Sequence, residues 1–212
     1  MDVLEFGRAA LACYFTFVAV FYTAKLFALR ARTGRSHEHR GAPGSAQRVG
    51  RVLFNGFRIA IWGVCLVRVP YPGLDAALGR FDPLYTAAVV ASGLLFLVAS
   101  LALVVYTHSY MSEDWMSGVS EEGPRRLITG GPFAAMRHPL FVAVALGQIG
   151  FFLALPSVFS LVSLLVGLSV LRVQAHVEDR ALDARFGALW RDYAERVPAF
   201  AVPGPFRRKV RG

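Results

Sequence analysis

The residues best suited to chemistry lie in two polar stretches, one on each side of a long apolar segment, residues 140–171. The first stretch ends in Arg137-His138-Pro139, and the second begins at Glu178. Proline costs no hydrogen bond at the first position of a helix, so Pro139 predicts a helix start. The free amides of that helix start, with Arg137 and His138 beside them, would attract an anion. Glu178 could hold a ribose hydroxyl or an ammonium group.

Aromatic and glycine residues in the same two stretches could surround a larger ligand. Phe133, Phe141, Trp190 and Tyr193 offer ring faces to an aromatic base or to a cation. The turn Gly130-Gly131-Pro132 lets the backbone bend sharply and approach a ligand closely. The whole set suits a ligand that bears a carboxylate, an amine, a ribose, an aromatic base and a positive centre. S-adenosylmethionine has all of these groups.

Simpler interpretations of the same residues stand beside this one. Arg137 can be only a topology signal, because basic residues concentrate beside membrane spans on the cytoplasmic side. Glu178 can be only the partner of Arg137 or Arg180 in an ion pair. The aromatic residues can form a membrane-interface belt or a packed helix face. Composition and spacing alone leave these alternatives open.

The composition is that of an integral membrane protein with a single domain. Of the 212 residues, 55% are hydrophobic and only 17% are charged, which is too little charge to cover a soluble domain. The net charge of +9 comes from basic residues in loops beside apolar runs, which favours anionic lipid headgroups over nucleic acid as partners. No Cys/His cluster has zinc spacing, so no metal site is expected. Cys13 and Cys65 lie in apolar segments and are predicted to be small core residues.

Membrane helices would bring the two polar stretches to the same place. The apolar runs predict an all-α fold of five membrane-spanning helices, at residues 9–29, 52–69, 84–106, 140–155 and 158–171. The last two form a hairpin, because Pro156 ends one helix and Ser157 is a good N-cap for the next. Small residues within this hairpin, among them Gly147, Gly150 and Gly167, would allow close helix packing. Arg172 begins a predicted amphipathic helix that Val197-Pro198 ends.

The charged loops predict the orientation and the parts of the chain. The basic loop 30–51 belongs on the cytoplasmic side, which places the N-terminus outside and the C-terminal helix in the cytoplasm. Residues 1–106 then form three N-terminal spans and residues 107–200 a cofactor-binding core, followed by a basic tail, 201–212.

One sequence pattern resembles a known family. Leu127-Ile128-Thr129-x-Gly131-Pro132-Phe133, with Arg137-His138-Pro139-x-Phe141, is similar to the core signature of the isoprenylcysteine carboxyl methyltransferase family. The hairpin and the downstream residues continue it over residues 107–200: Glu178, Leu182, Phe186-Gly187, Tyr193 and Val197-Pro198. The resemblance implies a multi-span methyltransferase of the bacterial type, in the inner membrane. It also implies that S-adenosylmethionine lies in a pocket at the cytoplasmic membrane face, with a lipid-side opening for the substrate.

The resemblance also implies roles for individual residues. It places Arg137 and Glu178 in the catalytic centre. The eukaryotic enzymes carry an arginine, thought to engage the substrate carboxylate, where this chain has Gln174, so Arg172 or His176 would have to substitute in substrate binding. The implied cofactor contacts are Arg126, Leu127, Ile128, Phe133, His138, Pro139, Leu140, Phe141 and Glu178.

The expected function is methyl transfer from S-adenosylmethionine to a lipidic or small hydrophobic acceptor, through a carboxylate, an amine or a thiol. A reductase of the sterol-reductase type is the alternative enzyme, because Arg125, Arg126 and Arg137 could suit the extra phosphate of NADPH. A non-catalytic membrane protein with a degenerate site is the third possibility. The sequence gives no indication of the oligomeric state.

Overall fold

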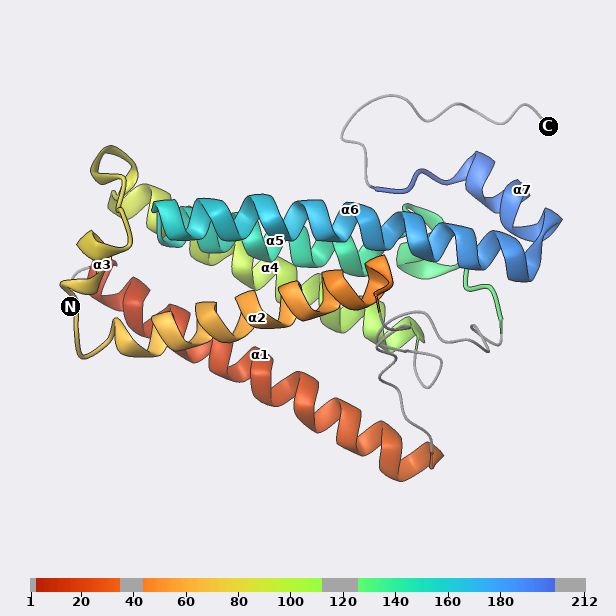
Figure 1. The fold of residues 1–212 in the computed structure, drawn as a ribbon, viewed down its shortest axis with the longest axis horizontal. Coiled ribbons are helices and arrows are strands. Elements are labelled where there is room, and N and C mark those ends of the chain that lie inside the picture. Colours follow the sequence, from red (N-terminus) through yellow and green to blue (C-terminus); the bar gives the residue numbers. More distant parts are fainter. Residues whose placement is uncertain (1–2, 35–43, 112–125, 201–212) are drawn as a thin grey trace.

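The computed structural model describes residues 3–34, 44–111 and 126–200, and this part of the chain is helical (Figure 1). A single antiparallel bridge, between Arg80 and Ser157, is the only β-pairing within those ranges. The predicted tail 201–212 and the centre of the predicted 30–51 loop lie outside them. In chain order the elements are α1 (Val3–Thr33), α2 (Ala46–Val67), α3 (Leu74–Ala77), η1 (Asp82–Leu84), α4 (Ala87–Met111), η3 (Gly131–Ala134), α5 (Pro139–Ala154), α6 (Val158–Phe186) and α7 (Ala188–Arg196).

Long apolar helices confirm the all-α membrane class. Four of them, α1, α2, α4 and α6, are long and apolar enough to cross a bilayer. Helix α5 has 16 residues, about 24 Å at 1.5 Å per residue, which is shorter than the hydrocarbon core of about 30 Å. The predicted count of five spans therefore stays a prediction.

Two predicted boundaries are wrong, because the helices continue further than the apolar runs. The helix that contains the last apolar run does not end at Arg172 but runs on as α6 to Phe186, since the sequence has neither Gly nor Pro between these two residues. The break comes at Gly187, whose φ of +51° suits glycine, and α7 follows it. Helix α2 begins at Ala46, inside the predicted loop, where the Ser45 hydroxyl accepts from the Arg48 amide as an N-cap.

The predicted hairpin turn is confirmed. Helix α5 ends at Ala154, and Ser157 caps α6 in a capping box with Ser160. The loop between α2 and α4 holds this turn from outside, because the Phe81 amide donates to the Pro156 carbonyl at 2.8 Å. This loop and turn lie at one end of the bundle, here called the opposite end. The other end, where α5 begins and α6 and α7 finish, is the site end (Figure 1).

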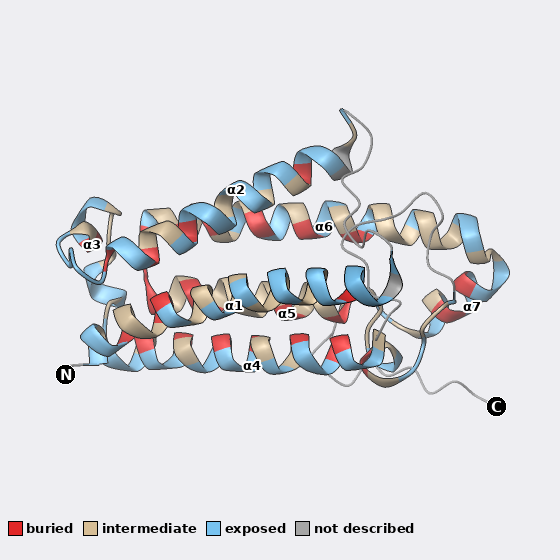
Figure 2. Cartoon of the chain, turned by 90° about the horizontal axis from the view of Figure 1, so that it is seen from below, coloured by how far each residue is buried: buried red, intermediate tan, exposed pale blue. Residues whose placement is uncertain are grey.

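Helix packing follows the small residues. Helix α5 packs most extensively on α4, and an added Cβ on Gly93 would come within 2.4 Å of the Ala154 backbone nitrogen. Gly150 meets the Gly93 carbonyl from the other side, as its predicted role requires. Buried residues follow the inward faces of the helices (Figure 2). Both cysteines are free thiols, but only Cys65 is in the core; the prediction for Cys13 is wrong, because it lies on an exposed face of α1.

A buried ionic cluster closes the opposite end. Arg68 Nε donates to Asp75 Oδ1 at 2.5 Å, and neither side chain is exposed. Arg8 of α1 reaches the other oxygen of Asp75 at 3.1 Å, which ties the loop to the N-terminal helix. Removing one member of such a buried pair leaves the other charge uncompensated, so this cluster is a structural element.

Candidate functional site

The two polar stretches meet at the site end. Nε2 of His138 lies 2.9 Å from Asp179 Oδ1, and its Nδ1 lies 3.4 Å from Glu178 Oε2. Arg137 donates to the other oxygen of Asp179 at 3.1 Å. The hairpin of α5 and α6 therefore brings together residues 41 positions apart in the sequence, as the sequence predicts.

His138 is the most deeply enclosed member of this contact. It is 4% exposed, precedes Pro139 at the start of α5, and stacks on Phe141 with ring centroids 5.3 Å apart. Burial lowers the pKa of His138, but the hydrogen bonds and charges of Asp179 and Glu178 outweigh burial and raise it to about 9. The imidazole is therefore an imidazolium at neutral pH.

Arg137 ties the start of α5 to the end of α7. Its guanidinium donates to the carbonyl oxygens of Ala194, at 2.8 Å, and Val197, at 3.1 Å. It also lies over the Trp190 ring, 5.6 Å from the centroid, and pairs with Asp179. From the sequence, Glu178 was considered as the partner of Arg137 in an ion pair, but the structure pairs Arg137 with Asp179. Three of these four contacts are thus with α7 or with Val197, its C-cap residue.

A glycine turn lies between α4 and α7. Gly131 has a φ of +59°, and a Cβ there would come within 2.3 Å of the Tyr110 ring at the end of α4. On the other side of the turn, the Tyr193 hydroxyl of α7 donates to the Phe133 carbonyl at 2.6 Å. Only glycine satisfies both the conformation and the space at position 131.

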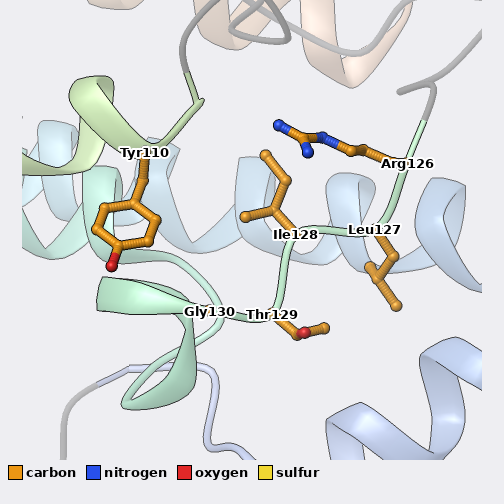
Figure 3. Close-up of a pocket in the computed structure, with 6 residues that line it drawn as sticks. All are labelled: Tyr110, Arg126, Leu127, Ile128, Thr129 and Gly130. Atoms are coloured by element: carbon orange, nitrogen blue, oxygen red, sulfur yellow. The ribbon is translucent and has the colours of Figure 1, made fainter.

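A pocket of about 210 Å³ opens beside this turn, lined by Tyr110 and residues 126–130 (Figure 3). The predicted cofactor residues Arg126, Leu127 and Ile128 are all in its wall. Side chains along this segment alternate: Arg126 and Ile128 point to the side of Tyr110, whereas Leu127 and Thr129 point away (Figure 3). The segment has no regular secondary structure, and this alternation of its side chains is that of an extended backbone.

The remaining predicted residues occupy different surroundings. Phe133, Leu140 and Phe141 are half-buried in the turn and the first turn of α5. Arg172 and His176 are exposed on α6, whereas Gln174 faces α2, where a Cβ on Gly50 would come within 2.9 Å of its amide nitrogen. The Glu178 side chain is 41% exposed and remains open to a ligand. The roles implied for these residues stay predictions.

Two residues of the site were not predicted. Asp179 pairs with both Arg137 and His138. The only sign of this role in the sequence is that Asp179 follows Glu178 directly. Tyr110 lines the pocket and abuts Gly131, a contact across the chain that no local pattern reveals. Within the described ranges, no three His, Cys, Asp or Glu side chains lie close enough together to hold a metal ion.

The comparisons with known proteins agree with this geometry. Residues 87–188 match a family model described as phospholipid methyltransferase, and this family covers membrane methyltransferases of the isoprenylcysteine carboxyl methyltransferase type. No curated protein and no solved structure was found to match the chain. The matched segment includes α4, α5, α6, the pocket-lining residues and both sides of the contact between the polar stretches. Over residues 87–188, just under half of its length, the chain is therefore similar to the phospholipid methyltransferase family.

Proposed function

We propose that the protein transfers a methyl group from S-adenosylmethionine to a lipidic or small hydrophobic acceptor at the cytoplasmic face of the membrane. The match to the phospholipid methyltransferase family over residues 87–188 supports a membrane methyltransferase. The observation that carries the cofactor assignment is the contact of His138 with Glu178 and Asp179, at the same end of the bundle as the pocket.

The charges of the side chains at the site end are complementary to those of the cofactor. His138 as an imidazolium and the start of α5 would favour the carboxylate of the amino-acid part. The accessible carboxylate of Glu178 would accept from the ammonium group or from a ribose hydroxyl. The ring of Phe141, whose plane is within 10° of the His138 plane, offers an apolar face. When bound, the cofactor supplies an electrophilic methyl group on a sulfonium.

The pocket fits only part of a ligand of that size. Its volume of about 210 Å³ is below the ~300–1,000 Å³ that small-molecule sites commonly have. We infer that the extended backbone of residues 126–130 holds one portion of the cofactor and that Glu178 and His138 hold another. Arg137 acts as a positioning residue, because its guanidinium is directed to Asp179 and to α7 carbonyls.

The charge state of His138 restricts the acid–base chemistry. A carboxylate or thiolate acceptor needs no general base, whereas an amine or alcohol does. His138 already carries a proton at neutral pH, so the base for such an acceptor is Glu178 or His176. Catalysis then rests mainly on positioning the two partners and on excluding water.

The reductase alternative is less well supported. The family match indicates a methyltransferase. Of the three arginines suited to the NADPH phosphate, Arg126 lines the pocket, Arg137 is engaged by Asp179, and Arg125 lies outside the described residues. A degenerate site is also disfavoured, because the Arg-His and Glu-Asp pairs are present and in contact.

The test is titration calorimetry of the detergent-purified protein with S-adenosylhomocysteine, with NADPH in parallel. We expect a dissociation constant in the micromolar range, about −8 kcal/mol, for the first ligand and no binding of the second. Glu178→Gln should weaken binding by ~10-fold or more and should lower the melting temperature less than Asp179→Asn does, because the Glu178 side chain is more exposed. Arg180→Gln, which changes an exposed neighbour on the same helix, is the matched control. Unchanged affinity in Glu178→Gln, or binding of NADPH alone, would refute the proposal.

A further inference from the structure

The chain after α7 returns to the residues that precede α5. Residues 197–200, here called the C-terminal strap, leave α7 with their first residue in an extended conformation. The first carbonyl oxygen of the strap accepts from the Arg137 guanidinium at 3.1 Å. The next two, of Pro198 and Ala199, accept from the backbone amides of Arg137 and His138 at 2.9 and 3.1 Å. Three successive hydrogen bonds therefore hold the strap against the start of α5.

The last residue of the strap contacts the His138 ring. The centroid of the Phe200 ring lies 5.9 Å from that of the imidazole, at an interplanar angle of 42°. Phe141 stacks on the same imidazole, and Glu178 and Asp179 of α6 contact its two nitrogen atoms. A protonated imidazole is attracted to aromatic rings as well as to carboxylates. His138 is thus restrained through its backbone amide, its ring and both ring nitrogens.

The strap also occupies the amides that precede α5. The amides of Arg137 and His138 donate to it, Pro139 has no N–H, and the Phe141 amide donates to the His138 carbonyl at 3.1 Å. Among the described residues, the Leu140 amide has no acceptor in this turn. The start of α5 therefore offers a ligand one free amide, and the expected row of free amides is absent from the described structure.

The enclosure of His138 limits how this residue can act on a ligand. His138 is only 4% exposed, whereas the side chain of Glu178 is 41% exposed. Nδ1 of His138 lies 3.4 Å from Oε2 of Glu178, so a fixed imidazolium restrains the carboxylate group. A side chain that is already restrained loses less conformational entropy when a ligand binds. His138 can therefore promote binding by holding Glu178 in place.

We propose that the C-terminal strap positions the site: Phe200 holds the His138 ring, and His138 orients Glu178 toward the ligand. Phe200 is then a positioning residue, because it acts through His138 and Glu178 without touching the cofactor. This inference rests on the proposed function for the identity of the ligand. The restraint of His138 by the strap is a property of the protein without ligand, so the two can be tested separately.

The first experiment is a double-mutant cycle in the full-length chain, with S-adenosylhomocysteine titrated by calorimetry. Phe200→Leu keeps an apolar side chain but removes the ring, and should weaken binding by ~5-fold. Phe200→Tyr keeps the ring and should bind like the wild type. In the Glu178→Gln background, Phe200→Leu should have almost no further effect, because the residue through which it acts has lost its charge. Equal effects of Phe200→Leu in the two backgrounds would overturn the proposal.

The matched control is Phe152→Leu. Phe152 is half-buried near the opposite end of the bundle, where its ring centroid lies 6.5 Å from that of Phe81. This variant loses the same ring from a similar aromatic contact, and it should bind S-adenosylhomocysteine like the wild type. An equal loss of affinity in Phe152→Leu and Phe200→Leu would show a general loss of packing and would count against a positioning role.

A second measurement uses the protein without ligand. In hydrogen–deuterium exchange, the peptide that contains Arg137 and His138 should exchange ~10-fold or more faster in Phe200→Leu than in the wild type, because their amides donate to the strap. Residues 145–152 in the middle of α5 should exchange alike in both proteins. Unchanged exchange at Arg137 and His138 would overturn the proposal. A wild-type protein that does not bind S-adenosylhomocysteine would refute the proposed function, and the exchange rates would still decide whether Phe200 holds the strap.

Discussion

From the contact of Asp179 with Arg137 and His138 we predict both a loss of stability in Asp179→Asn and its dependence on pH. Asp179→Asn keeps the shape of the side chain but removes the negative charge that two cations share. The pKa of His138 is raised from 6.5 to about 9, which favours the imidazolium in the folded protein. At ~1.4 kcal/mol per unit, the full shift is worth about 3 kcal/mol.

Only part of that energy depends on Asp179. Glu178 also stabilises the imidazolium, and the Asp179 side chain is 24% exposed, so solvent weakens its interactions. We expect the substitution to cost about 2 kcal/mol at pH 7. For a chain of this length, the melting temperature should fall by about 4–8 °C.

The loss should depend on pH in a defined direction. Because the folded-state pKa of His138 is raised, its stabilisation is fully present below the unfolded value of about 6.5 and is lost as the pH rises through about 9. The difference between the wild type and Asp179→Asn should therefore be largest near pH 6 and shrink toward pH 10. It should not vanish, because the attraction of Asp179 to Arg137 does not titrate in this range.

The assay follows the reaction of the buried Cys65 thiol with a fluorogenic maleimide as the temperature rises and the protein unfolds. The exposed Cys13 is replaced by alanine, and this thiol melt is repeated in steps from pH 6 to pH 10. Asp183→Asn is the matched control one turn along α6: its pair with Arg191 is solvent-exposed, so the variant should change stability by ~0.5 kcal/mol or less. Equal melting temperatures for the two Asn variants would refute the structural role of Asp179. A constant difference from pH 6 to pH 10 would refute the charged state of His138.

Two further predictions use paired variants. Gly131→Ala should weaken S-adenosylhomocysteine binding ~10-fold or more in calorimetry, because its Cβ would come within 2.3 Å of the Tyr110 ring and its φ is positive. Gly56→Ala, on α2 with open space around it, should bind normally, and equal affinities of the two variants would contradict this account. Asp75→Asn should lower the free energy of unfolding by about 3–5 kcal/mol in the thiol melt, because it leaves the buried Arg68 uncompensated. Asp82→Asn, at an exposed ion pair, should leave the free energy of unfolding almost unchanged. An Asp75→Asn protein as stable as the wild type would show that the buried pair is dispensable.

Local signals in the sequence correctly predicted the starts of α5 and α6 and the turn between them. Pro139 begins α5 and Ser157 caps α6, because both residues act on the backbone next to them. The meeting of the two stretches was also predictable, since two consecutive apolar helices joined by a tight turn return the chain to the same end. The exact partner was not: Asp179, one residue after Glu178, is rotated by about 100° on the helix and reaches Arg137.

Features that depend on tertiary contacts were beyond the sequence. The change from apolar to charged residues at Arg172 marks a change in the surroundings of the helix and not its end, because α6 continues to Phe186. The wall formed by Tyr110 depends on how closely α4 approaches the glycine turn. Gln174 faces Gly50 because α2 begins earlier than its apolar run and reaches α6.

Acidic residues have different roles at the two ends of the bundle, and this difference indicates the end at which a ligand binds. At the opposite end, Asp75 is fully enclosed by arginines and has no exposed surface. At the site end, Asp179 holds the structure while Glu178, its neighbour, is 41% exposed. Substitution of Asp75 should therefore lower stability without changing the dissociation constant of the folded protein. Substitution of Glu178 should mainly raise the dissociation constant, with a smaller loss of stability than substitution of Asp75. Equal losses of stability in the two variants, or equal changes in their dissociation constants, would contradict this division of roles.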